Sequence, residues 1–66
     1  MRITLNGESF ELTGSPTVSG LLAQLEIDPR RVAVERNMVV LKRGTFDATE
    51  LVDGDEIEIV NFVGGG

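Results

Sequence analysis

The residues that could carry chemistry lie at the end of the sequence, where Val63 is followed by Gly64-Gly65-Gly66. Glycine has no side chain, and ordering it costs more backbone entropy than ordering any other residue, so these glycines are not expected in a core. Such a segment either frays or acts as an arm that carries its own α-carboxylate into the active site of another protein. Because glycine lacks a Cβ, the arm could pass through a channel that excludes every side chain. Fully extended, residues 63–66 would span roughly 13 Å at about 3.3 Å per residue.

The rest of the sequence lacks the usual catalytic side chains. The 66 residues include no cysteine and no histidine, which removes thiol nucleophiles, disulfides, thiolate metal sites and the commonest general base. The serines and threonines have no base to activate them. The carboxylates of residues 53–58 are expected to form a solvated acidic face and not a metal site, because alternate residues of a strand point to opposite sides. We therefore expect no catalytic residue and no metal ligand in this chain.

Eleven acidic and six basic residues give a formal charge of −5. This charge disfavours a nucleic-acid partner, because binding to phosphates depends on basic side chains. It permits electrostatic steering toward basic protein surfaces, or it simply keeps a small protein in solution. The Arg30-Arg31 pair is expected to be a solvated turn that could join a docking surface.

The sequence shows no membrane or export signal. The longest apolar run, residues 38–41, is far shorter than the ~20 residues that span a bilayer, and residues 1–7 contain no apolar region typical of a signal peptide. We expect a cytoplasmic protein with no membrane partner, monomeric when free.

Two alternating segments, residues 1–5 and 8–12, flank Asn6-Gly7. This dipeptide is the strongest short signal of a β-hairpin, because a type I′ turn needs positive φ at both central residues. A two-residue turn places Ile3 opposite Phe10, so the turn and the hydrophobic pattern predict the same register.

A helix is predicted after the breaker residues 13–16, with Thr17 as its N-cap. The apolar residues that follow recur at i, i+3, i+4 and i+7, and they are Val18, Leu21, Leu22 and Leu25. The helix is expected to end near residues 24–26. Gly20 lies inside it at a cost of about 1 kcal/mol relative to alanine, which suggests a close approach to the sheet.

The second half of the sequence predicts three more strands, at residues 32–35, 38–42 and 56–63, with a turn at Asn37 and a polar crossing segment that holds Phe46 and Leu51. One amphipathic helix and several one-sided strands bury themselves as two layers. A hairpin at each end with the helix between them predicts an α+β, β-grasp fold with a mixed sheet, in which the last strand lies centrally beside the first. We expect residues 1–63 to form the domain and residues 64–66 to form a flexible tail.

The hydrophobic pattern of the last strand predicts a docking surface. Ile57 and Ile59 share the core face, and period two then places Val60 and Phe62 on the solvent face, directly before the glycines. Exposed apolar clusters commonly mark protein–protein sites. The predicted docking residues are Val60, Phe62 and Val63, to which Met38 and Val39 could add. The alternative is that the strand twists outward and Phe62 covers the sheet edge.

Several segments, in this order, carry a family resemblance: Arg-Ile-Thr-Leu-Asn-Gly-Glu at 2–8, Thr-Val-x-x-Leu-Leu at 17–22, Arg-Val-Ala-Val-Glu at 31–35, Leu-Val-Asp-Gly-Asp-Glu-Ile-Glu-Ile-Val at 51–60 and Val-Gly-Gly-Gly at 63–66. Over its whole length the chain resembles the ThiS family of sulfur carriers from thiamine biosynthesis.

The resemblance implies a ubiquitin-like β-grasp fold and a role as a protein cosubstrate that binds no cofactor itself. It implies that a ThiF-like adenylyltransferase uses ATP with Mg to activate the Gly66 carboxylate as an acyl-adenylate. Sulfur from a donor such as a cysteine desulfurase would then replace AMP and leave a thiocarboxylate. A ThiG-like thiazole synthase would take that sulfur for the thiazole ring, and Gly64 and Gly65 would give the carboxyl group access to each active site.

Other classes of protein remain open from the sequence. One is a sulfur carrier for another pathway, such as molybdopterin or cysteine synthesis. Another is a ubiquitin-like modifier that is joined to lysines through Gly66, because that chemistry is shared as far as the adenylate. A third is a plain interaction domain with an inert tail.

Overall fold

The structure is a computed structural model that describes residues 1–62. The predictions made for Val63 and for the tail at residues 64–66 lie outside the described residues. The helices and strands, in chain order, are β1 (Arg2–Leu5), β2 (Glu8–Glu11), α1 (Val18–Gln24), the 3-10 helix η1 (Pro29–Arg31), β3 (Val32–Arg36), β4 (Val39–Val40), the 3-10 helix η2 (Arg43–Thr45) and β5 (Glu56–Asn61).

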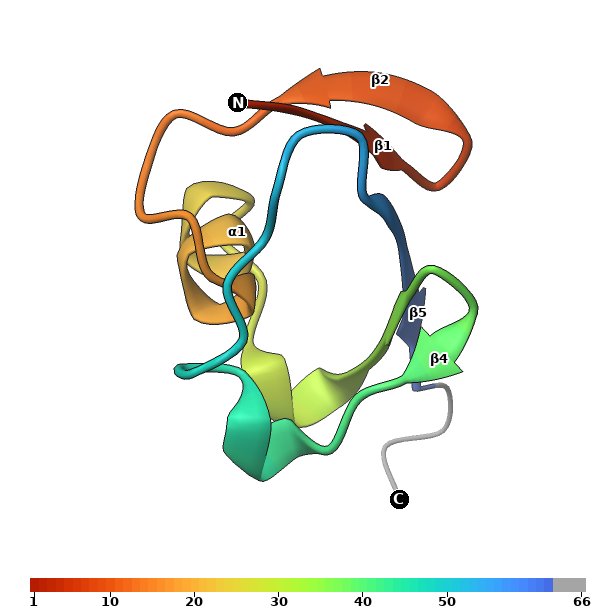
Figure 1. The fold of residues 1–66 in the computed structure, drawn as a ribbon. Helices are drawn as coiled ribbons and strands as arrows, with labels where there is room; N and C mark the ends of the chain where they lie inside the picture. The colour runs from red at the N-terminus through yellow and green to blue at the C-terminus, as the bar shows by residue number, and fades with distance from the viewer. Residues whose placement is uncertain (63–66) are drawn as a thin grey trace.

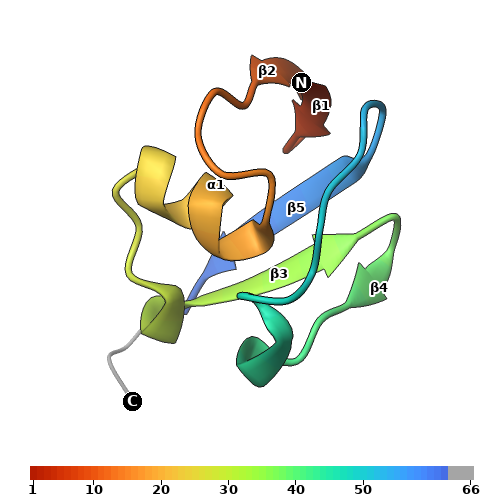
Figure 2. The same cartoon turned by 60° about the vertical axis from the view of Figure 1, so that its left-hand side comes forward.

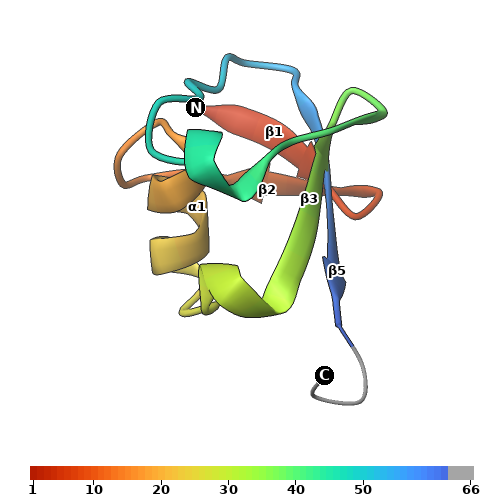
Figure 3. The ribbon, with the colours of Figure 1, turned by 90° about the horizontal axis from the view of Figure 1, so that it is seen from below.

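The strands form one sheet in the order β2-β1-β5-β3-β4 (Figure 1). β5 runs parallel to β1 and antiparallel to β3, so the last strand lies in the centre beside the first, as predicted (Figure 2). α1 and both 3-10 helices lie on the same side of β3 and β5 (Figure 3). The predicted β-grasp fold, a mixed sheet with one helix across it, is therefore confirmed.

The first hairpin has the predicted register. Ile3 lies opposite Phe10, and Leu5 lies opposite Glu8. The turn residues Asn6 and Gly7 have φ angles of 49° and 83°, which is the left-handed geometry that their residue types favour. Turn chemistry and side-chain alternation thus act together to fix the start of the sheet.

The helix begins at the predicted cap, because the Thr17 side chain accepts a hydrogen bond of 3.0 Å from the Gly20 backbone N–H. Gly20 has a different role from the predicted one. A Cβ at this position would lie 2.1 Å from the Ser15 carbonyl oxygen, so Gly20 makes room for the loop before the helix and not for the sheet.

Side chains from every layer meet in one core. The buried apolar residues are Ile3, Leu12, Val18, Leu21, Leu22, Val32, Val34, Phe46, Leu51 and Ile57. The predicted helical stripe supplies three of them, and Leu25 packs against them from the edge. Phe46 and Leu51, the apolar residues of the crossing segment, are buried, and they fix this segment against the helix side of the sheet.

The fourth strand is shorter than predicted. Asn37 and Met38 have φ angles of 51° and 73°, so Met38 belongs to the turn. β4 therefore contains only Val39 and Val40, which pair with Arg36 and Glu35. The prediction of a strand over residues 38–42 was wrong in its bounds, because Met38 was not recognised as the second turn residue after Asn37. After β4, the Leu41 backbone N–H still donates a hydrogen bond to the Val34 carbonyl oxygen, and the Leu41 side chain packs against the core.

Candidate functional site

The candidate site is built around the end of β5. The strand ends at Asn61, and the Phe62 backbone N–H then donates a 2.9 Å hydrogen bond to the Arg31 carbonyl oxygen. This bond continues the pairing with β3 by one residue. The backbone is therefore fixed in the sheet up to Phe62, four residues before Gly66.

The two faces of β5 differ as the sequence predicts. Ile57 is buried and Ile59 packs against the core, whereas the side chains of Val60 and Phe62 are 54% and 55% exposed. The strand thus keeps its alternation to the end. Phe62 does not bury itself at the sheet edge, so the prediction of two exposed apolar side chains on this face is confirmed.

The strand register shows which other apolar residues share this outer face. Val40 lies opposite Glu35, and Glu35 lies opposite Glu58, so Val40 is on the same face as Val60. Ala33, partly exposed, lies opposite Val60 on the strand between them. We call Val40, Val60 and Phe62 the outer apolar patch; Val40 is 65% exposed.

The other two predicted docking residues lie apart from this patch. Val39 is exposed but pairs with Arg36, on the opposite face of the sheet. Met38 is 87% exposed in the β3–β4 turn, next to the beginning of β5 and away from Phe62. Sequence reasoning missed Val40 because it did not pair Glu35 with Val40 across a two-residue turn. The docking roles of all these residues stay predictions.

Arg43 completes the surroundings of Phe62. Its guanidinium carbon lies 5.9 Å from the centre of the Phe62 ring, within the range of a cation–π interaction. Its Nε donates a 3.0 Å hydrogen bond to the Pro29 carbonyl oxygen, which ties η2 to η1. This contact has no signal in the sequence, because Arg43 and Phe62 lie far apart along the chain and meet only in the folded structure.

Basic residues gather at this end of the molecule. The side chains of Arg30 and Arg31 are about four-fifths exposed, as predicted for a solvated turn, and both lie near Asp28, with N–O distances of 3.0 and 3.8 Å. Hydrogen bonds from the Arg30 side chain and backbone lower the pKa of Asp28 to about 2. The same carboxylate raises the pKa of Arg30.

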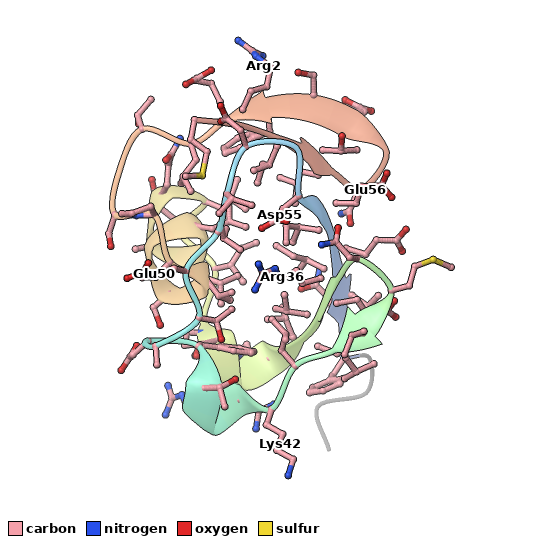
Figure 4. The ribbon with its side chains drawn as sticks, viewed as in Figure 1. Arg2, Arg36, Lys42, Glu50, Asp55 and Glu56 are labelled. Atoms are coloured by element: carbon pink, nitrogen blue, oxygen red, sulfur yellow. The ribbon has the colours of Figure 1, made fainter. Side chains whose placement is uncertain are left out.

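One acidic residue of the 53–58 stretch is not solvated, which corrects the prediction. Asp55 is only 4% exposed, and its carboxylate lies 3.2 Å from Arg36 Nε. It also accepts hydrogen bonds from Asn37 Nδ2 at 3.1 Å and from the Val52 backbone N–H at 2.9 Å. Figure 4 shows Asp55 and Arg36 close to each other near the middle of the view. The carboxylate is thus a structural group that joins three segments.

The remaining polar side chains of the described residues do not form a catalytic or metal-binding arrangement. Ser19 has an acidic partner that the sequence did not predict, because its hydroxyl donates a hydrogen bond to Asp47. Its backbone N–H also donates to the Phe46 carbonyl oxygen, so both contacts tie α1 to the crossing segment.

Within residues 1–62 no three acidic side chains converge in a metal-binding arrangement. In the same part of the chain, no helix is long and apolar enough to cross a membrane.

Solved structures support the fold directly. The crystal structure of a thiamine biosynthesis protein (ThiS) from Geobacter metallireducens superimposes with a TM-score of 0.83 at 40% sequence identity, and each chain is covered completely. Among curated proteins, the sulfur carrier protein ThiS of Bacillus subtilis is 38% identical over 97% of this chain and 98% of its own length.

Longer proteins contain a similar segment. A thiazole synthase from Magnetococcus marinus is 48% identical over the whole of this chain, and one from Paramagnetospirillum magneticum is 42% identical. This chain spans only 20% of the length of each. The match between this chain and the ThiS family covers residues 3–66, which include the C-terminal glycines. The chain therefore belongs to the ThiS family.

Proposed function

We propose that this chain is the sulfur carrier protein of thiamine biosynthesis, with sulfur held as a thiocarboxylate on Gly66. The observation that carries the proposal is the family match, because it extends through the glycines to Gly66 itself. The relative from Bacillus subtilis, which this chain covers almost completely, is named as a sulfur carrier. The position of β5 supports the same role, since it ends beside an exposed apolar patch just before the tail.

The chemistry of a terminal carboxylate explains the cycle. Its pKa is near 3.5, so at pH 7 it is ionised and a poor electrophile. In the proposed first step, a carboxylate oxygen of Gly66 attacks the α-phosphorus of ATP on a ThiF-like adenylyltransferase, and pyrophosphate leaves. A persulfide on a donor such as a cysteine desulfurase then attacks the acyl carbon with its outer sulfur, and AMP leaves. A thiol attacks the donor sulfur of the resulting acyl disulfide, so that the S–S bond breaks, a new disulfide forms with the donor and the thiocarboxylate remains on Gly66. The ATP, its Mg and the catalytic groups all belong to partners.

A ThiG-like thiazole synthase is the proposed recipient of the sulfur. The thiazole synthases that match this chain contain a segment similar to it over its full length, which supports a functional link between the two kinds of protein. In this proposal, Gly64 and Gly65 let Gly66 pass through a narrow channel, and the predicted docking residues hold the domain outside it. The chain acts as a cosubstrate, monomeric when free, in the cytoplasm where ATP is used.

The experiment is an intact-mass measurement after coexpression with the adenylyltransferase and sulfur donor of the source organism. We expect a mass increase equal to the replacement of one oxygen by sulfur, located on the C-terminal peptide. One matched control is a chain without residues 64–66, which has no terminal glycine carboxylate. The other is the variant Gly65→Val, whose side chain the narrow channel would exclude. Neither should gain the mass. Unmodified chain together with lysine-linked conjugates would instead identify a protein modifier.

A further inference from the structure

The chemical character of the side chains on the outer face of the sheet changes along β5. The side chains on this face are Glu56, Glu58, Val60 and Phe62. Across the neighbouring strand, Glu58 faces Glu35, Val60 faces Ala33 and Phe62 bonds to the backbone of Arg31. Along β5 the surroundings therefore change from acidic, through apolar, to basic residues at the end of the molecule where the strand leads to residues 63–66.

The acidic end contains an arrangement that folding alone does not favour. Glu35 and Glu58 lie directly opposite each other on antiparallel strands. Like charges in this position repel, and such a pair is destabilising. Among residues 1–62, neither carboxylate takes part in an ion pair. A cation supplied from outside would relieve the repulsion and could bond both carboxylates at once.

Four of the six basic residues lie at the basic end, namely Arg30, Arg31, Lys42 and Arg43. The other two lie elsewhere: Arg36 is paired with Asp55 in the interior, and Arg2 is paired with Glu11 at the opposite end of the molecule (Figure 4). Asp28 offsets Arg30 and Arg31. Within the described residues, Lys42 and Arg43 have no carboxylate partner, and Arg43 is held against Phe62. A chain of net charge −5 thus keeps exposed positive charge beside the root of its tail.

We propose that this order of charge determines the direction in which the adenylyltransferase binds the carrier, an inference that rests on the proposed function. The partner surface that fits has an apolar site for Val60 and Phe62. An arginine or lysine borders this site against Glu35 and Glu58, and carboxylates lie opposite Lys42 and Arg43, where residues 63–66 enter. A small apolar patch alone permits several orientations. Charges of opposite sign at its two ends exclude the reversed orientation, because that would bring like charges together.

The test uses the double variant Glu35→Gln/Glu58→Gln and purified adenylyltransferase, with affinity measured by titration calorimetry. We expect binding to weaken by about tenfold or more, the range for losing charge-assisted contacts at an interface. The same variant should unfold at an equal or slightly higher temperature, because the repulsion between the two carboxylates is gone. Loss of affinity without loss of stability separates a docking role from a structural one.

The matched control is Glu26→Gln/Glu50→Gln, which removes the same charge from exposed positions beside α1. Glu26 follows the C-cap of α1, and Glu50 pairs with its N-cap, Thr17, so neither lies on the outer face. Its affinity should stay within about twofold of the wild type, since exposed charges farther than a Debye length from an interface are largely screened. Equal weakening by the two double variants would show a general charge effect and overturn the proposal. So would a wild-type chain that does not bind the adenylyltransferase.

Lys42→Glu tests the basic end without disturbing the contact between Arg43 and Phe62. We expect it to weaken binding several-fold and to slow association most at low ionic strength. Unchanged affinity would remove the basic end from the proposal. The mass measurement remains an independent readout, because failure of thiocarboxylate formation in the wild type would reject the carrier function whatever the charge variants show.

Discussion

Phe62 combines a firmly held backbone with a half-exposed ring. Its N–H bonds to Arg31 and its ring lies under Arg43, so the side chain is already ordered on the surface where the tail begins. Aromatic residues that are ordered before binding lose little entropy on association, and they are common among the residues that dominate interface energies.

We expect Phe62→Asp to keep the fold and to weaken adenylyltransferase binding by at least about tenfold, because a charge replaces the apolar ring. Circular dichroism and titration calorimetry measure the two effects separately. The control is Val52→Asp, another exposed apolar position that lies in the crossing region and not on β5. Unfolding of the Phe62 variant would show that its ring contributes to the core and would contradict this role.

Asp28 gives the fold a specific dependence on acid. Its pKa in the folded chain is about 2, below the ordinary value of 3.8, because Arg30 donates hydrogen bonds to it. A carboxyl group whose pKa is lowered by folding stabilises the folded state above its unfolded pKa, and this contribution is lost as the pH falls through the folded pKa.

The expected result is therefore a loss of stability between about pH 4 and pH 2 that is smaller in the variant Asp28→Asn. Denaturant unfolding at several pH values measures it, and a carboxyl NMR titration gives the pKa directly. An Asp28 carboxyl that titrates at its ordinary pKa would mean that the Arg30 contacts do not persist in solution.

At the level of elements, α1 depends on a close contact with the loop before it. Gly20 lies where a Cβ would meet the Ser15 carbonyl oxygen at 2.1 Å. Alanine at this position would gain about 1 kcal/mol in helix propensity, but it would push apart the two segments that the Thr17 cap brings together.

We expect Gly20→Ala to destabilise the protein by about 1–3 kcal/mol, because overpacking against backbone outweighs the gain in propensity. The control is Gly44→Ala, since a Cβ there meets nothing within 4 Å. Denaturant unfolding of both variants measures the difference. A Gly20 variant as stable as the wild type would show that the loop can move away at little cost.

The elements that could be predicted are those in which local and long-range signals agree. The Asn6-Gly7 turn and the alternation around it specify one register, and Thr17 with the apolar stripe specifies one helix. β4 could not be predicted fully, because a left-handed Met38 has no sequence signal of its own. The places of Val40 and Arg43 in the site could not be predicted either. Val40 reaches the outer face through the pairing of β4 with β3, and Arg43 reaches Phe62 through the path of the crossing segment.

For the whole molecule, Asp55 is the group that connects the parts. It bonds to Arg36 on β3, to Asn37 in the β3–β4 turn and to Val52 in the segment before β5. Asn37 in turn accepts a hydrogen bond from the Glu56 backbone N–H. The sequence could not show this, because an aspartate in an Asp-Gly-Asp turn is usually solvated.

Asp55→Ala should destabilise the fold by about 3 kcal/mol, because it leaves the Val52 N–H and the partly buried Arg36 guanidinium without their partner. In a domain of this size that loss lowers the Tm by roughly 10–20 °C. Thermal unfolding measures the shift, with the exposed neighbour variant Glu56→Ala as control. Similar Tm values for the two variants would show that water replaces the Asp55 contacts.

The central position of β5 has a mechanical consequence for the proposed cycle, in which partner enzymes bind the residues that follow this strand. Tension on residues 63–66 would run along β5, and the hydrogen bonds to β1 and β3 lie across that direction. They would share the force in shear and would not peel apart one after another, as they would at an edge strand. Under the proposed function, a partner enzyme could therefore pull on the C-terminal carboxyl group without unfolding the domain that carries it.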